Sequence, residues 1–168
     1  LLVLLCIYHL QLKIYIDYTA KPNERKIGGS AAISEDKGLY FINPLGTDTS
    51  KPIQIWTQGE TESNSAWFPT IDKPNQKTTE ELTVTVDNKY VTLSNGKLMS
   101  QKKNTDGTRT DYWKMELPHA PYLFFLGVGN YSITKDSWRG KEVNYYVEPE
   151  YASVAKKIFG NTPEMIEF

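Results

Sequence analysis

An amide and a carboxylate separated by one glycine are the residues of this chain with the clearest chemical potential: Gln58, Gly59 and Glu60. They end a segment, residues 53–58, whose side chains alternate with the period of two that a β-strand requires. If that geometry continues, Gln58 and Glu60 share one face, and Gly59, which has no Cβ, lets a ligand or another chain come close. The segment therefore offers a carboxylate and an amide together at a strand end. A simple solvated strand end is the alternative interpretation.

The residues after Glu60 indicate a rigid turn. Residues 61–65 are polar, and two proline turns follow, Trp-Phe-Pro at 67–69 and Asp-Lys-Pro at 72–74, where proline fixes the backbone. Asp72 is expected to accept a hydrogen bond from a turn amide, and both Asp72 and Lys73 are interpreted as structural. Three tryptophans are most simply core or interface aromatics: Trp56, Trp67 and Trp113.

These blocks resemble the signature Thr-Gln-x-Glu…Phe-Pro-x-x-Asp-x-Pro…Lys of the aminopeptidase N family of zinc metallopeptidases. Residues 57–60, 67–69, 72–74 and Lys77 carry the match, which extends through 93–96, 121–125 and 129–131. The resemblance covers roughly residues 10–168. It is to the family's N-terminal, saddle-shaped β domain and not to its catalytic domain, because the Gly-x-Met-Glu-Asn and His-Glu-x-x-H motifs of the active site are absent from this sequence.

The resemblance implies a role for both polar residues. In this family the matching Glu, here Glu60, receives the α-ammonium of a peptide substrate, and the matching Gln, here Gln58, lines the pocket for the first side chain. A desolvated ammonium needs a carboxylate partner and several acceptors, which suits these residues. The expected partners are a peptide amino terminus and a catalytic domain that holds zinc. This chain alone is expected to hold no catalytic residue, to bind no catalytic zinc and to be inactive.

A second function from another class stays open, namely a free-standing β-sandwich module that binds peptide or carbohydrate through exposed aromatics. Tyr122 and the Tyr145-Tyr146 pair would suit such a surface, although tyrosine-rich strands are ordinary material of β-sandwiches. Glu148 and Glu150 flank Pro149 and resemble a paired-carboxylate site only in sequence, because nothing nearby suggests acid–base chemistry.

Composition excludes other classes of function. The chain has 168 residues, 19 basic and 20 acidic, and a formal net charge of −1, so it has no field that would attract nucleic acid. Its single cysteine, Cys6, excludes an internal disulfide framework. The two histidines, His9 and His119, do not have metal-ligand spacing. The length suits a single domain with one sizeable core.

Strand and turn signals recur along most of the chain at the spacing of a β-sandwich. Strands are predicted at residues 10–19, 39–42, 82–86, 90–93, 112–117 and 143–148. Asp106-Gly107 is the best hairpin signal, and the unbroken apolar run 121–128 predicts a central strand covered on both faces. We therefore expect a mainly β, antiparallel β-sandwich over residues 1–148, and the resemblance implies that it is saddle-like.

The pattern becomes helical at Pro149. An apolar stripe at helical spacing follows, formed by Tyr151, Val154, Ala155 and Ile158. Thr162 is predicted as the N-cap of a second helix, with Pro163 in its first turn. The sequence stops at Phe168, about one turn later, and a single turn is not stable alone. A truncated chain is therefore expected, and the resemblance to the aminopeptidase N family implies that residues 149–168 start a helical connection to an absent catalytic domain.

The first residues give no firm assignment. Residues 1–7 are apolar enough for the core of a secretion signal, but they lack a basic leader and a small-residue cleavage site. They are also too short to span a membrane. A buried or artefactual strand is the favoured interpretation, and a targeting remnant is the alternative. The sequence assigns no compartment to the protein.

Overall fold

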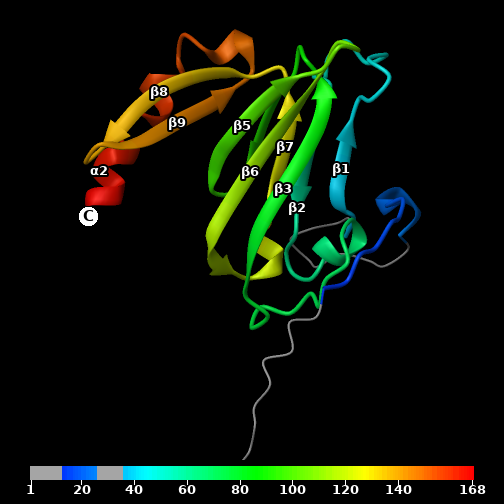
Figure 1. Cartoon of the computed structure of the whole chain (residues 1–168). Coiled ribbons are helices and arrows are strands. Elements are labelled where there is room, and N and C mark those ends of the chain that lie inside the picture. Colours follow the sequence, from blue (N-terminus) through cyan, green and yellow to red (C-terminus); the bar gives the residue numbers. More distant parts are fainter. Residues whose placement is uncertain (1–12, 26–35) are drawn as a thin grey trace, which may run out of the picture.

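The computed structural model describes residues 13–25 and 36–168, and in these ranges the chain is mainly β, as predicted. Its larger antiparallel sheet has the order β1 (Gly38–Ile42), β2 (Gln54–Gln58), β7 (Leu126–Gly129), β4 (Val91–Ser94). A second sheet has the order β3 (Thr78–Asp87), β6 (Thr108–His119), β5 (Lys97–Lys103). The strands β8 (Ser132–Trp138) and β9 (Lys141–Val147) form a separate hairpin, which projects away from both sheets (Figure 1).

Short helical segments connect and end these strands. Four are single 3-10 turns: η1 (Pro22–Glu24), η2 (Asn64–Ala66), η3 (Pro121–Leu123) and η4 (Pro149–Tyr151). Two short α-helices follow the last strand: α1 (Ala155–Phe159) and α2 (Thr162–Glu167). In Figure 1, α2 lies beside the tip of the β8–β9 hairpin, where Trp138 donates from Nε1 to Glu167 at 2.7 Å. No helix in the described residues is long and apolar enough to cross a membrane.

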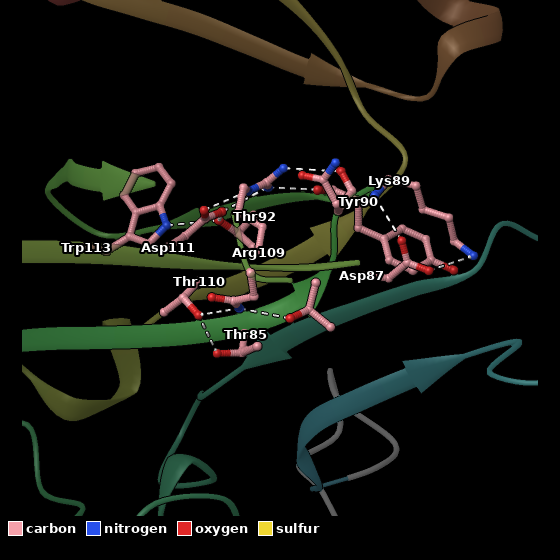
Figure 2. A network of polar contacts seen from close by, with 12 residues as sticks. Thr85, Asp87, Lys89, Tyr90, Thr92, Arg109, Thr110, Asp111 and Trp113 are labelled. Carbon is pink, nitrogen blue, oxygen red and sulfur yellow. Dashed lines mark hydrogen bonds and ion pairs between the residues drawn. The ribbon is translucent and has the colours of Figure 1, made fainter. Parts of the chain in front are cut away.

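Buried polar groups connect the two sheets (Figure 2). The side chain of Asp111, on β6, has no exposed surface and accepts a hydrogen bond at 2.6 Å from Thr92, on β4 of the other sheet. Arg109 donates two bonds to the same carboxylate, at 2.7 and 2.9 Å, and Trp113 donates to Thr92 at 3.0 Å. Burial opposes ionisation, but these donors and the Arg109 charge together hold the pKa of Asp111 below its ordinary value.

The chain crosses between the sheets with very few residues. Strand β4 ends at Ser94 and β5 begins at Lys97, so Asn95 and Gly96 make the whole connection. Gly96 has a φ of 79°, and a Cβ there would collide with the backbone of Lys114 on β6. This corner therefore requires glycine.

The hairpin predicted at Asp106-Gly107 is confirmed. It joins β5 to β6, and the backbone N–H of Asn104 donates to the carbonyl of Thr108 at 2.9 Å. The carboxylate of Asp106 accepts from the Thr108 amide at 3.0 Å, while Gly107 takes a φ of 86°.

The central position predicted for the run 121–128 is also confirmed, since β7 lies between β2 and β4. Only its second half is strand, because Pro121 lacks an N–H and opens η3.

The strand predicted at residues 10–19 is wrong in the part that the structure describes. This part forms no strand, and Ile14 and Tyr15 are 73% and 90% exposed. An alternating pattern can give a strand only where a neighbouring strand accepts its hydrogen bonds, and residues 13–20 pair with none. Residues 1–12, including the segment 1–7, and residues 26–35 lie outside the described ranges.

The N-cap of the last helix is also one residue from its predicted place. Asn161, and not Thr162, precedes α2, although Pro163 does lie in the first turn. The hydroxyl of Thr162 donates to the carbonyl of Phe159 at 2.6 Å. It is therefore used to close the preceding turn.

Replacing Asp111 by Asn should remove about 3 kcal/mol of unfolding free energy at pH 7, because the Arg109 guanidinium loses its charged partner inside the protein. The folded pKa of Asp111 is below its ordinary value of 3.8, so its stabilising contribution is complete above that pH. It is lost as the pH falls through the lower, folded value. Urea denaturation at pH 7 and in acid measures both effects.

The matched control for this variant is Glu116→Gln on the same strand. That carboxylate is 74% exposed and pairs with Lys114 at 3.0 Å, and exposed pairs contribute little. Equal stability losses in the two variants would contradict the role assigned to the buried carboxylate.

Candidate functional site

Strand β2, which leads to the predicted site, is held on both sides. It pairs with β1 over its full length and with β7 over residues 54–56. The buried hydroxyl of Thr57 accepts from the backbone N–H of Leu126 at 3.0 Å. On the opposite face Trp56 stacks on Tyr40 with ring centroids 4.7 Å apart. The end of this strand, at Gln58, therefore has a fixed position.

The turn after Gln58 is anchored by a buried amide that the sequence analysis did not single out. Asn64 has no exposed surface, and its Nδ2 donates to the carbonyls of Pro121 at 2.5 Å and Phe124 at 3.1 Å. Its Oδ1 accepts from the indole N–H of Trp67 at 2.8 Å. Asn64 thus ties the turn to η3, 57 residues further along the chain. In the sequence, Asn64 is one of several polar residues in a turn, and nothing there indicates that it is buried.

The expected approach of a ligand to Gly59 is corrected by the structure. Gly59 is buried, and a Cβ there would lie 2.6 Å from Nδ2 of Asn64 and would also collide with the carbonyl of Tyr122. The space that glycine leaves is therefore filled by the protein itself. Glycine is needed here for packing inside the turn and not for access by a ligand.

Glu60 lies at the exposed start of this turn, and Gln58 is partly buried before it. The peptide bond between Glu60 and Thr61 is cis. The backbone carbonyl of Glu60 accepts a hydrogen bond from the hydroxyl of Ser63 at 3.1 Å. No basic side chain in the described ranges forms an ion pair with the Glu60 carboxylate, whereas nearby Glu62 pairs with Lys73 at 2.7 Å. Glu60 is therefore exposed to solvent without a basic partner among the described residues.

The structural interpretation of Asp72 is confirmed, because its carboxylate accepts from the backbone N–H of Ser65 at 2.8 Å. Lys73 makes the surface ion pair with Glu62. The hydroxyl of Tyr18 also holds this turn, because it donates to the carbonyl of Trp67 at 2.9 Å. These contacts hold the turn that follows Glu60 from several sides.

The described residues contain no group of three His, Cys, Asp or Glu side chains that could hold a metal ion. What the site offers is the exposed carboxylate of Glu60 on a braced turn and the half-buried amide of Gln58 two residues earlier, at the end of β2. Such a pair can bind a polar or cationic group, and it is not a complete catalytic arrangement.

The mainly β architecture agrees with that of a known family of protein domains. The chain belongs to the Peptidase M1 N-terminal domain family, whose model matches residues 11–123. The resemblance to the N-terminal β domain of the aminopeptidase N family is therefore confirmed.

Individual relatives agree with this assignment. Human glutamyl aminopeptidase is 30% identical over 133 residues, which are 78% of this chain and 14% of that protein. Chicken transcription initiation factor TFIID subunit 2 is 27% identical over 134 residues, or 78% of this chain and 11% of that protein. The chain thus spans only a small part of the curated relatives it matches.

A solved structure shares the fold. The crystal structure of Legionella pneumophila aminopeptidase A in complex with aspartic acid superimposes with a TM-score of 0.57 at 25% sequence identity. The match covers 68% of this chain and 15% of that one.

Replacing Asn64 by Asp should lower the unfolding free energy by about 3 kcal/mol at pH 7, because two buried carbonyls lose their donor and a charge is buried. Part of the loss should return in acid, since a protonated carboxyl can again donate one hydrogen bond. Thermal or urea unfolding at both pH values measures this. The exposed Asn130 provides the control, because Asn130→Asp should change stability little at either pH. An Asn64→Asp variant as stable as this control would contradict the anchoring role.

Proposed function

We propose that this domain works within a longer zinc-dependent aminopeptidase, which removes amino-terminal residues from peptides, and that it contributes recognition of the peptide amino terminus. The observation that carries the proposal is the unpaired carboxylate of Glu60 at the end of β2, in a chain of the M1 N-terminal family. Relatives of this chain include glutamyl aminopeptidases and aminopeptidase B.

In the proposed arrangement, Glu60 accepts hydrogen bonds from the α-ammonium of the substrate and Gln58 lines the pocket for its first side chain. A charge-assisted bond to a carboxylate is about twice as strong as a neutral one. Its strength depends on a fixed geometry, and the buried amide of Asn64 and the pairing of β2 support such a geometry. Recognition of this kind would select peptides whose amino terminus is free.

Zinc and the catalytic residues would belong to another domain of the longer protein, since no set of metal ligands occurs in the part described here. A covering domain is also favoured by large apolar side chains exposed on the last helix, because exposed apolar patches often mark interfaces. They are Met165 and Ile166. We place the boundary between the β domain and the helical connection at residues 148 and 149.

The test is Glu60→Gln in the longer protein. This change keeps the shape and removes the charge, so the bound ammonium loses a charge-assisted hydrogen bond of about 1.5–3 kcal/mol. The value of kcat/KM for an aminoacyl anilide should fall by roughly 10- to 150-fold. Zinc content and Tm should stay as in the wild type.

The matched control is Glu62→Gln, because this second carboxylate of the turn already pairs with Lys73 at the surface. It should leave kcat/KM nearly unchanged. A Glu60→Gln enzyme within twofold of wild type would refute the recognition role. A fall in zinc content or Tm would instead assign Glu60 a structural role.

A second candidate function is that of a non-hydrolytic component of a protein assembly. It is favoured by the relatives named as TFIID subunit 2, from chicken at 27% and zebrafish at 26% identity. The two candidates differ in one measurement. Release of free amino acids from peptides by the longer zinc-loaded protein supports the peptidase. Its absence over a full panel of aminoacyl anilides supports the assembly role.

A further inference from the structure

A cavity of about 340 Å³ lies between β2, the base of the β8–β9 hairpin and the helical segment that follows. Its volume is at the lower end of the range typical of small-molecule sites. Most of its lining is aromatic or aliphatic: Tyr131, Tyr146, Val147, Tyr151, Ile158 and Phe159. Gln54 and Glu148 are the other two lining residues in the part of the chain that the structure describes. It is separate from the site at Glu60, because Gln54 and Gln58 are at opposite ends of β2, about 13 Å apart.

Among the described residues that line the cavity, Glu148 is the only one with a charged side chain. Nε2 of Gln54 donates to its Oε1 at 3.0 Å, which fixes one oxygen across 94 residues of sequence. No lysine or arginine of the described ranges pairs with it, and no described donor other than Gln54 bonds it. A partly buried carboxylate with one neutral donor would be stabilised further by a positively charged partner.

The aromatic walls suit the same partner. The rings of Tyr131 and Tyr146 meet edge to face, with centroids 6.4 Å apart and planes at 82°. Two perpendicular rings give a cation both a face and a side wall, as in the sites that bind alkylated ammonium groups. Burial, and then the charge of Glu148, raise the pKa of Tyr131. The same charge that disfavours a phenolate here would favour a cation.

We propose that this cavity binds an alkylammonium ion, with its charge at Glu148 and its alkyl stem against Tyr131 and Tyr146. The cation is either a free amine or the side chain of a lysine, since both present the same group. An anion would meet the Glu148 carboxylate, and a neutral alcohol would leave that carboxylate without a counter-charge. The site is independent of amino-terminus recognition by Glu60.

The direct test is titration of the 168-residue chain with n-butylammonium chloride at constant ionic strength, followed by ¹H–¹⁵N NMR. Shifts should concentrate on residues around the cavity, and 1-butanol, which has the same stem without the charge, should bind at least about fivefold more weakly. Equal affinity for amine and alcohol would overturn the proposal. So would shifts that avoid the cavity.

Two variants locate the charge and the ring. Glu148→Gln keeps an acceptor for Gln54 and should weaken n-butylammonium binding about tenfold or more, while Glu150→Gln, an exposed carboxylate two residues away, should not. Tyr131→Leu should weaken it about two- to fivefold, and the exposed Tyr15→Leu should not. A Glu148→Gln chain that remains folded by NMR and binds within twofold of wild type would refute the proposal.

The source of the cation is distinguished with a pair of blocked peptides, acetyl-Ala-Lys-Ala-amide and its norleucine analogue. Tighter binding of the lysine peptide than of n-butylammonium indicates a side chain of a polypeptide, and weaker binding indicates a free amine. If the norleucine peptide binds as well as the lysine peptide, charge recognition in the cavity is excluded. Glu60→Gln should leave all these affinities unchanged, which separates this site from the proposed function.

Discussion

The two sheets of this domain meet over a carboxylate that water does not reach. Asp111 stays ionised there because Arg109 and Thr92 donate to it, and a buried charge without such partners would be very costly. The bond to Thr92 sets the position of β4 relative to β6. Since β4 pairs with β7 and β7 pairs with β2, the location of Glu60 at the end of β2 depends on this interaction.

Polar contacts recur throughout the interior. Among the described residues, seven buried side chains are polar or charged. A second link between the sheets joins Ser94 on β4 to the buried Glu80 on β3 at 3.2 Å. Burial raises the pKa of Glu80, although Ser94 and His119 oppose this effect. Hydrogen bonds specify one register, whereas apolar contacts tolerate sliding, so such an interior favours a single arrangement of the strands.

The sequence predicted those features that depend on neighbours in the chain. Alternation and turn chemistry located β3, β4, β9 and the hairpin at Asp106-Gly107, because a strand's period and a turn's φ angles are local properties. The same reasoning failed for residues 13–20, with which none of the described strands pairs. It also gave the wrong reason for Gly59, because the group that fills the space beside it belongs to Asn64.

In the candidate sites too, features set by neighbours in the chain could be predicted and features set by long-range packing could not. The pair Gln58 and Glu60 could be found from the sequence, since its spacing and the surrounding motifs are local. The contact of Gln54 with Glu148 could not, because it joins residues 94 positions apart through the packing of β2 against the hairpin base. Buried anchors such as Asn64 and Asp111 are likewise recognised only once burial is known.

The two-residue corner at Asn95 and Gly96 has a consequence for evolution. The chain changes sheets there within a space that excludes even a methyl group beside β6, so an inserted residue would have little room at this corner. Added residues are therefore expected to be tolerated better elsewhere in the domain. Gly107 and Gly140, which have open space around them, mark the hairpin tips where the domain can lengthen without disturbing its sheets.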